Sequence, residues 1–128
     1  MFTHNNKTRL FKNLDPKKDE FIVVKELLNH FGKRTNFPSI VDGLLDKEGT
    51  AINEDGCCFP GDLDEYELYN DYNGVPFEGV KCWVYEDEIT VSEEVFFGLL
   101  KEACERYIEL HPDEKDELQK IMAQSTLI

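Results

Sequence analysis

The sequence contains no hydrophobic run long enough to cross a membrane. Its longest apolar stretches, such as Phe21–Val24, are far shorter than the roughly 20 residues that a membrane-spanning helix needs. The first residues include no apolar segment followed by a small-residue cleavage site, so no signal peptide is predicted. These absences predict a cytoplasmic protein with no membrane partner.

The cysteines do not have the spacing of a metal site. The 4 cysteines include no Cys-x-x-Cys motif, and the 3 histidines show no ligand spacing relative to them. No acidic stretch matches a calcium-binding EF-hand loop: aligning Gly74 with the glycine of that loop places Tyr69 and Val80 where oxygen ligands belong. We therefore expect reduced thiols, no metal site and no cofactor.

Signatures of catalysis are also missing. The chain has no Gly-x-Ser-x-Gly, His-Glu-x-x-His, phosphate-cradling or dinucleotide-binding motif. A cysteine–histidine pair that meets only in space would leave no such local signature. The sequence predicts a protein that is not an enzyme, and the alternative of an enzyme requires a pocket with converging polar groups.

Basic residues are almost absent from the middle of the chain. Residues 41–94 contain 16 aspartates and glutamates against Lys47 and Lys81 alone, a net charge of −14 within a chain whose total is −13. Such a segment repels nucleic acid and attracts basic proteins, so we expect no direct nucleic-acid partner. The alternative interpretation is that the acidic composition serves only to keep the protein soluble.

The chain contains enough apolar residues to form one folded domain. At 128 residues and 41% hydrophobic content, the chain predicts a single domain over residues 1–128 with its own core. Helical spacing and helix-start signals predict four helices: from Asp15-Pro16 to Gly32, at 39–47, from Ser92 to His111, and from Pro112 to about Met122.

The acidic middle has the pattern of short strands and turns. Asp55-Gly56, Pro60-Gly61 and Asn73-Gly74 are turn dipeptides. Alternation predicts strands at 66–70, 80–85 and 89–91, the last two joined by the polar connection 86–88. The predicted fold class is α+β, a small antiparallel sheet packed against several helices.

Carboxylates alternate with aromatic side chains in this middle segment. Tyrosine and tryptophan often anchor protein interfaces, and surrounding carboxylates would pair with lysines and arginines of a partner. An acidic inhibitor that imitates the charge of a polyanion could block the cleft of a nuclease. The candidate residues for binding such a basic partner are Asp62, Asp64, Glu65, Tyr66, Glu67, Tyr69, Asp71, Tyr72, Trp83, Glu86 and Asp87.

The amino-acid sequence of the second half also resembles that of a known family. The stretches that carry the resemblance are Cys57-Cys-Phe-Pro-Gly61, Phe77-Glu-Gly-Val80, the run from Glu86 to Phe96, its continuation to Tyr107, and His111-Pro112. Together they cover roughly residues 55–115 and resemble the immunity proteins of bacterial contact-dependent growth inhibition, in the group that protects against ribonuclease toxins.

This resemblance implies a cytoplasmic non-enzyme that binds a cognate ribonuclease toxin domain. It supplies no binding residues of its own, so the candidate residues rest on charge and aromatic content. It also leaves open whether the active site or another surface of the toxin is covered. A small acidic regulatory or adaptor module that binds some other basic protein is the alternative function.

Overall fold

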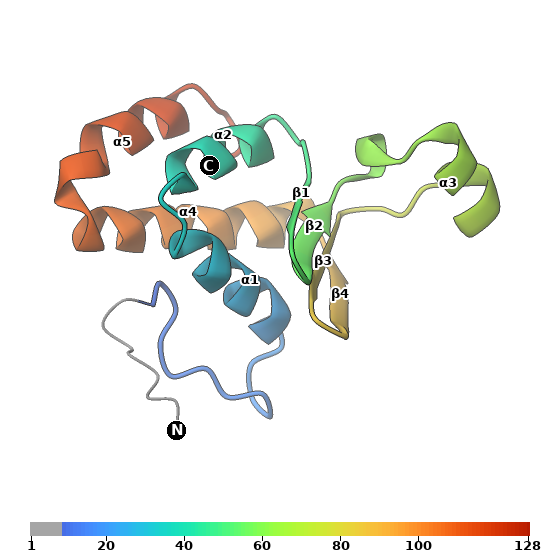
Figure 1. Ribbon diagram of the computed structural model, residues 1–128, viewed down its shortest axis with the longest axis horizontal. Helices are drawn as coiled ribbons and strands as arrows, with labels where there is room; N and C mark the ends of the chain where they lie inside the picture. The colour runs from blue at the N-terminus through green and yellow to red at the C-terminus, as the bar shows by residue number, and fades with distance from the viewer. Residues whose placement is uncertain (1–8) are drawn as a thin grey trace.

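The computed structural model describes residues 9–128. The N-terminal residues 1–8, for which no signal peptide is predicted, lie outside the described part. Residues 9–128 form five α-helices and one four-stranded antiparallel sheet, which confirms the α+β class (Figure 1). Among the helices of these residues, none has the length and apolar character needed to cross a bilayer.

The sheet has its strands in chain order, so each strand pairs with the next. The strands are β1 (Thr50–Ile52), β2 (Asp55–Cys58), β3 (Val80–Val84) and β4 (Asp87–Val91). Two-residue turns close the outer hairpins, and each begins with a residue at positive φ, Asn53 at 57° and Tyr85 at 55°. The backbone N–H of Tyr85 donates to the carbonyl of Glu54, which ties the two turns together.

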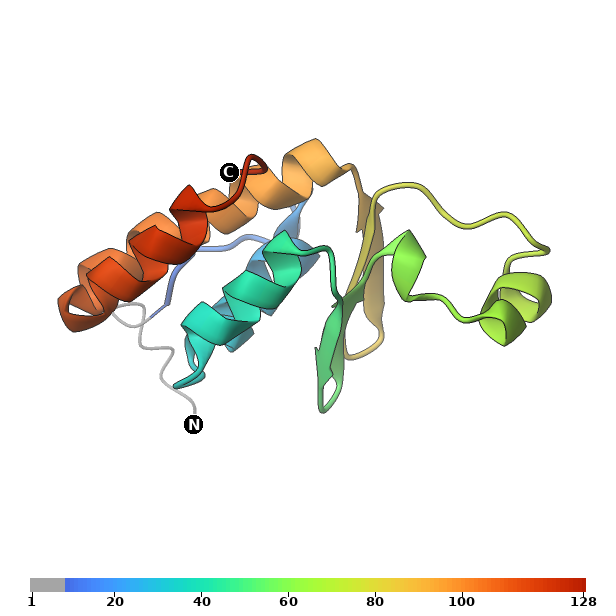
Figure 2. The same cartoon turned by 90° about the horizontal axis from the view of Figure 1, so that it is seen from above.

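Four helices lie on one face of this sheet. They are α1 (Ile22–Gly32), α2 (Phe37–Leu45), α4 (Glu93–Leu110) and α5 (Lys115–Ala123). Both views show all of them on the same side of the strands, with α1 against the sheet and α2 beside α5 (Figures 1 and 2). Their buried apolar side chains form one cluster with the inward-facing residues of the strands.

The structure confirms the helix predicted from Ser92 to His111, which is α4. Ser92 is its N-cap and accepts a hydrogen bond from the Val95 N–H at 3.1 Å, and two glutamates occupy the positive end of the helix dipole. The apolar stripe places Phe96, Leu100 and Tyr107 in the core. The strand at 80–85 and its partner at 89–91 are also confirmed, within one or two residues at their ends.

The predicted start of the first helix at Asp15-Pro16 is wrong. Asp15 instead caps an isolated turn, in which its carboxylate accepts from the Lys17 N–H at 2.9 Å. Asp19 then opens a second turn by accepting from the Phe21 N–H at 3.1 Å, and α1 begins only at Ile22. Two aspartates that each bond the backbone two residues ahead compete with a continuous helix.

Two predictions in the acidic middle are wrong as well. Asp55-Gly56 is not a turn but the start of β2, because the turn is made by Asn53 and Glu54 just before it. Residues 66–70 are not a strand but lie within helix α3 (Glu65–Asp71).

Candidate functional site

A projecting arm, residues 60–79, separates the two central strands of the sheet. It leaves the sheet after β2 and returns at β3, and it carries a 3-10 turn (Pro60–Asp62) followed by α3. The arm extends from the side of the sheet opposite the four packed helices (Figure 2). Each of the seven residues of α3 is exposed or half-buried, so this helix contributes nothing to the core.

Helix α3 is capped at both ends. Asp64 accepts from the Glu67 N–H at 2.8 Å, while Glu67 accepts from the Asp64 N–H at 3.4 Å, a reciprocal capping box. At the other end, the Gly74 N–H donates to the Leu68 carbonyl at 2.8 Å, with Asn73 and Gly74 both at positive φ. Two of the candidate contact residues, Asp64 and Glu67, therefore already serve the local fold.

Asp62 fixes the point at which the arm leaves the domain. Its Oδ2 atom accepts from the Phe59 N–H at 2.7 Å and from the Gly49 N–H at 2.9 Å. The ring of Phe59 is buried against Phe96 and Phe97 of α4, with ring centroids 5.8 and 6.0 Å apart. The outgoing end of the arm is thus attached both to the core and to the loop before β1.

The returning end of the arm is fixed by Tyr72. Its ring lies 5.6 Å from that of Phe77, and its hydroxyl accepts from Lys81 Nζ at 3.0 Å. Lys81 also forms an ion pair of 3.3 Å with Glu88 on β4. The hydrogen bond to Tyr72 raises the pKa of Lys81, partly opposed by burial, so the lysine is charged at neutral pH.

Between these two attachments the arm displays aromatic side chains to solvent. Tyr66 is 74% exposed and Tyr69 is 68% exposed. Glu65 and Asp71, at the two ends of the same helix, are exposed as well. Exposed tyrosines amid carboxylates combine a large contact area with a charge that a basic partner would neutralise.

The candidate carboxylates are not neutralised within the described part of the chain. No ion pair among residues 9–128 involves Asp62, Asp64, Glu65, Glu67, Asp71, Glu86 or Asp87. Residues 9–21 lie along α1, across the molecule from α3 (Figures 1 and 2). Their ion pairs stay at that end: Arg9 binds Glu26 and Asp19 binds Lys25, both at 2.8 Å.

The other three candidates lie at the β3–β4 hairpin rather than on the arm. Trp83 is half-buried on β3, while Glu86 and Asp87 are exposed at the turn. The structure therefore divides the candidate residues into an arm group from Asp62 to Tyr72 and a hairpin group. Within the arm group, Asp62, Asp64, Glu67 and Tyr72 hold the arm in place. The other four, Glu65, Tyr66, Tyr69 and Asp71, are exposed.

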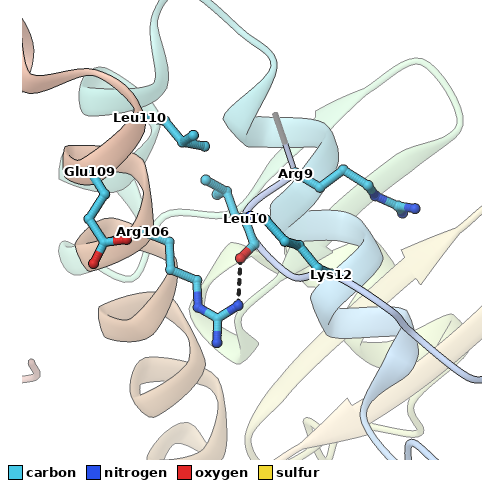
Figure 3. Close-up of a pocket in the computed structure, with 6 residues that line it drawn as sticks. All are labelled: Arg9, Leu10, Lys12, Arg106, Glu109 and Leu110. Carbon is cyan, nitrogen blue, oxygen red and sulfur yellow. Dashed lines mark hydrogen bonds between the residues drawn. The ribbon is translucent and has the colours of Figure 1, made fainter. Parts of the chain in front are cut away.

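A hollow of about 300 Å³ lies at the other end of the molecule, between residues 9–12 and the end of α4 (Figure 3). Arg106 points to the Leu10 carbonyl, to which it donates at 2.8 Å, and also binds Glu102 at 2.6 Å. The guanidinium of Arg9 points away from Arg106 (Figure 3). Both arginines are engaged by the protein itself, and they do not converge on a reacting centre.

Metal ligands and reactive thiols are likewise not gathered into a site. In the part of the chain that the structure describes, no three His, Cys, Asp or Glu side chains are placed to hold a metal ion. All four cysteines are free thiols, as expected, and three of them are buried. Burial raises the pKa of the Cys57 and Cys104 thiols to about 12, so they are protonated and unreactive at neutral pH.

Fold and surface together define an acidic α+β domain whose projecting arm presents exposed tyrosines and carboxylates that form no ion pair among residues 9–128. A family model described as CDI immunity protein matches residues 19–122. The chain belongs to this family of immunity proteins of contact-dependent growth inhibition, which confirms the family that the sequence resembles. Among curated proteins, none matches the chain. An immunity protein neutralises a cognate toxin by binding it, so the partner of this chain is a toxin protein.

Proposed function

We propose that this immunity protein neutralises a ribonuclease toxin domain by placing its acidic arm in the basic cleft that binds RNA. The observation that carries the proposal is the combination on α3 of two strongly exposed tyrosines with carboxylates that lack ion-pair partners among the described residues. A cleft that attracts phosphate must be basic, and a protruding helix with aromatic and acidic side chains complements it in shape and charge.

The arm also suits this task because both of its ends are attached to the domain by hydrogen bonds. Asp62 anchors its start, and the Tyr72–Lys81 contact anchors its return. A preorganised element loses less conformational entropy on binding than a flexible loop. Neutralisation would take place in the cytoplasm, where RNA is the substrate to be protected, and it requires neither cofactor nor nucleic acid.

The proposal is tested with the toxin domain encoded immediately upstream. Co-expression should rescue growth, and the purified complex should show no RNA cleavage. Reversing Glu65 and Asp71 together to lysine should slow association about tenfold or more at low salt, because steering by charge is lost. Reversing Lys17 and Lys18 to glutamate is the matched control, since both are exposed on the chain before α1.

The results separate the parts of the proposal. Rescue without any ribonuclease activity in the neighbouring domain would retain immunity but exclude a ribonuclease toxin. Equal effects of the two double reversals on the association rate would show that the acidic arm is not the interface.

A further inference from the structure

In the part of the chain that the structure describes, no helix packs on one face of the sheet. The helices cover the face formed by residues such as Cys57, Val80 and Cys82, which are buried. Residues paired across neighbouring strands point to the same side, so the register defines the opposite face. This open face consists of Ala51, Gly56, Cys58, Lys81, Trp83, Glu88 and Thr90.

Trp83 lies at the centre of the open face. Its register partner on β2 is Gly56, and a Cβ atom at Gly56 would lie only 2.6 Å from Cζ2 of the indole. The ring therefore lies across the backbone of β2, in space that a side chain at position 56 would fill. Around it, Ala51 and Thr90 are small and exposed, which leaves the half-buried indole accessible from the solvent side.

The arm and the open face belong to the same side of the molecule. The arm leaves the sheet next to Cys58 and returns next to Lys81, both of which are on this face. Both views show the arm extending away from the packed helices (Figures 1 and 2). A partner that grips the arm is therefore brought close to the open face.

The charge around the open face selects the same kind of partner as the arm does. Glu88 is exposed on the face itself, and Glu54, Glu86 and Asp87 are exposed at the two hairpin turns beside it. Lys81 is the single basic residue on the face, and Glu88 and Tyr72 already engage it. A basic surface would be attracted to this region, and an acidic one would be repelled.

We propose that the toxin domain occupies this open face as well as the arm, with Trp83 as the second aromatic anchor of the interface. This inference rests on the proposed function, because its partner is the same basic toxin domain. Fully covered tryptophans surrounded by small or polar contacts are typical centres of binding energy in protein interfaces. The arm then steers and positions the toxin, and the sheet face slows its release.

The test introduces bulky cations at the small exposed positions and leaves Trp83 in place. Ala51→Arg and Thr90→Arg each add a long, positively charged side chain to the open face. Gln119→Arg adds the same side chain to the exposed surface of α5 and is the control. Thermal unfolding of all three variants should match that of the wild type, because none of the positions is buried.

Dissociation constants for the toxin domain should rise at least tenfold for Ala51→Arg and Thr90→Arg and stay unchanged for Gln119→Arg. Because the chain has a single tryptophan, 5-fluorotryptophan labelling gives one 19F resonance for the free protein, and this resonance should shift when unlabelled toxin binds. Both readouts report on the open face without altering the arm.

Each other outcome overturns the inference. If the wild type binds and both arginine variants bind equally well, the toxin does not occupy this face, and the arm proposal alone survives. If the wild type does not bind the toxin at all, both proposals fail. If the arginine variants change the oligomeric state of the free protein in sedimentation, the face is a contact between copies of this chain.

Discussion

Lys81 on β3 donates a hydrogen bond of 3.0 Å to the hydroxyl of Tyr72, nine residues earlier at the end of α3. Its ammonium group also lies 5.6 Å from the centroid of the Tyr72 ring. A side chain of the sheet thus holds the far end of a helix that has no core contacts of its own. Isolated helices this short are marginal in water, so the order of the arm depends on such attachments.

Lys81→Met should loosen the arm with little effect on global stability. The substitution keeps most of the side-chain volume but removes the donor to Tyr72 and the ion pair with Glu88. We expect a loss of at most about 1 kcal/mol in unfolding free energy, typical of a partly exposed ion pair. Amide hydrogen exchange in α3 should nevertheless become faster. Lys47→Met, which removes the exposed ion pair with Glu93, is the control and should leave exchange in α3 unchanged.

Asp62→Ala should destabilise the base of the arm. It leaves the N–H groups of Phe59 and Gly49 without their acceptor, and loss of a comparable capping group costs about 0.5–2 kcal/mol. Urea unfolding measures this loss. Asp71→Ala removes an exposed carboxylate from the same arm and should leave stability unchanged. Equal stability of the two variants would contradict the anchoring role of Asp62.

Tyr66→Ala and Tyr69→Ala should leave the fold intact and weaken toxin binding. Both side chains are mostly exposed, so the free energy of unfolding should change by less than about 0.5 kcal/mol. If they are the aromatic anchors of the arm, at least one should cost about 2 kcal/mol of binding energy, roughly a 30-fold rise in the dissociation constant. Leu110→Ala, at the exposed end of α4, is the control. Wild-type affinity in both tyrosine variants would remove α3 from the interface.

The buried thiols predict a loss of stability at alkaline pH. Folding raises the pKa of Cys57 and Cys104 from 9.0 to about 12, mainly because burial penalises the thiolate. Their contribution to stability is complete below pH 9 and declines above it, because the unfolded chain then loses protons that the folded chain retains. Between pH 9 and 12, each thiol should remove about 1.4 kcal/mol of unfolding free energy per pH unit.

Urea titrations at pH 8, 9, 10 and 11 measure this slope. Cys104→Ala is the informative variant. Its unfolding free energy should fall less steeply with pH above pH 9 than that of the wild type, by the contribution of one thiol. This difference in slope does not depend on the stability of the variant at pH 8. A slope identical to that of the wild type would show that Cys104 does not titrate differently in the two states.

The sequence predicted the elements whose signals are local. Ser92 followed by two glutamates and an apolar stripe defined α4, and the alternation from Val80 onwards defined β3. The same kind of alternation predicted a strand at residues 66–70, where the structure has a helix. Asp64 and Glu67 have the spacing of a capping box, and this signal for a helix start outweighs five alternating residues.

The functional residues were harder to assign, because composition cannot separate contact from support. The carboxylates of Asp62 and Glu65 look alike in sequence. Only the fold brings Asp62 to the N–H of Gly49, thirteen residues away, and leaves Glu65 in solvent. Likewise, the significance of Trp83 depends on Gly56, which becomes its neighbour only when β2 and β3 pair.

The place of the arm in the chain also bears on how such a protein can diversify. β2 and β3 are adjacent antiparallel strands, which a two-residue turn would connect, yet residues 59–79 lie between them. Both ends of this insertion meet the sheet side by side. The part that follows the buried Phe59 can therefore change in length and sequence during evolution, or be exchanged between related chains in the laboratory, while strand register and core are preserved. If the arm binds the toxin as proposed, recognition of a new toxin would require a new insertion rather than a new fold.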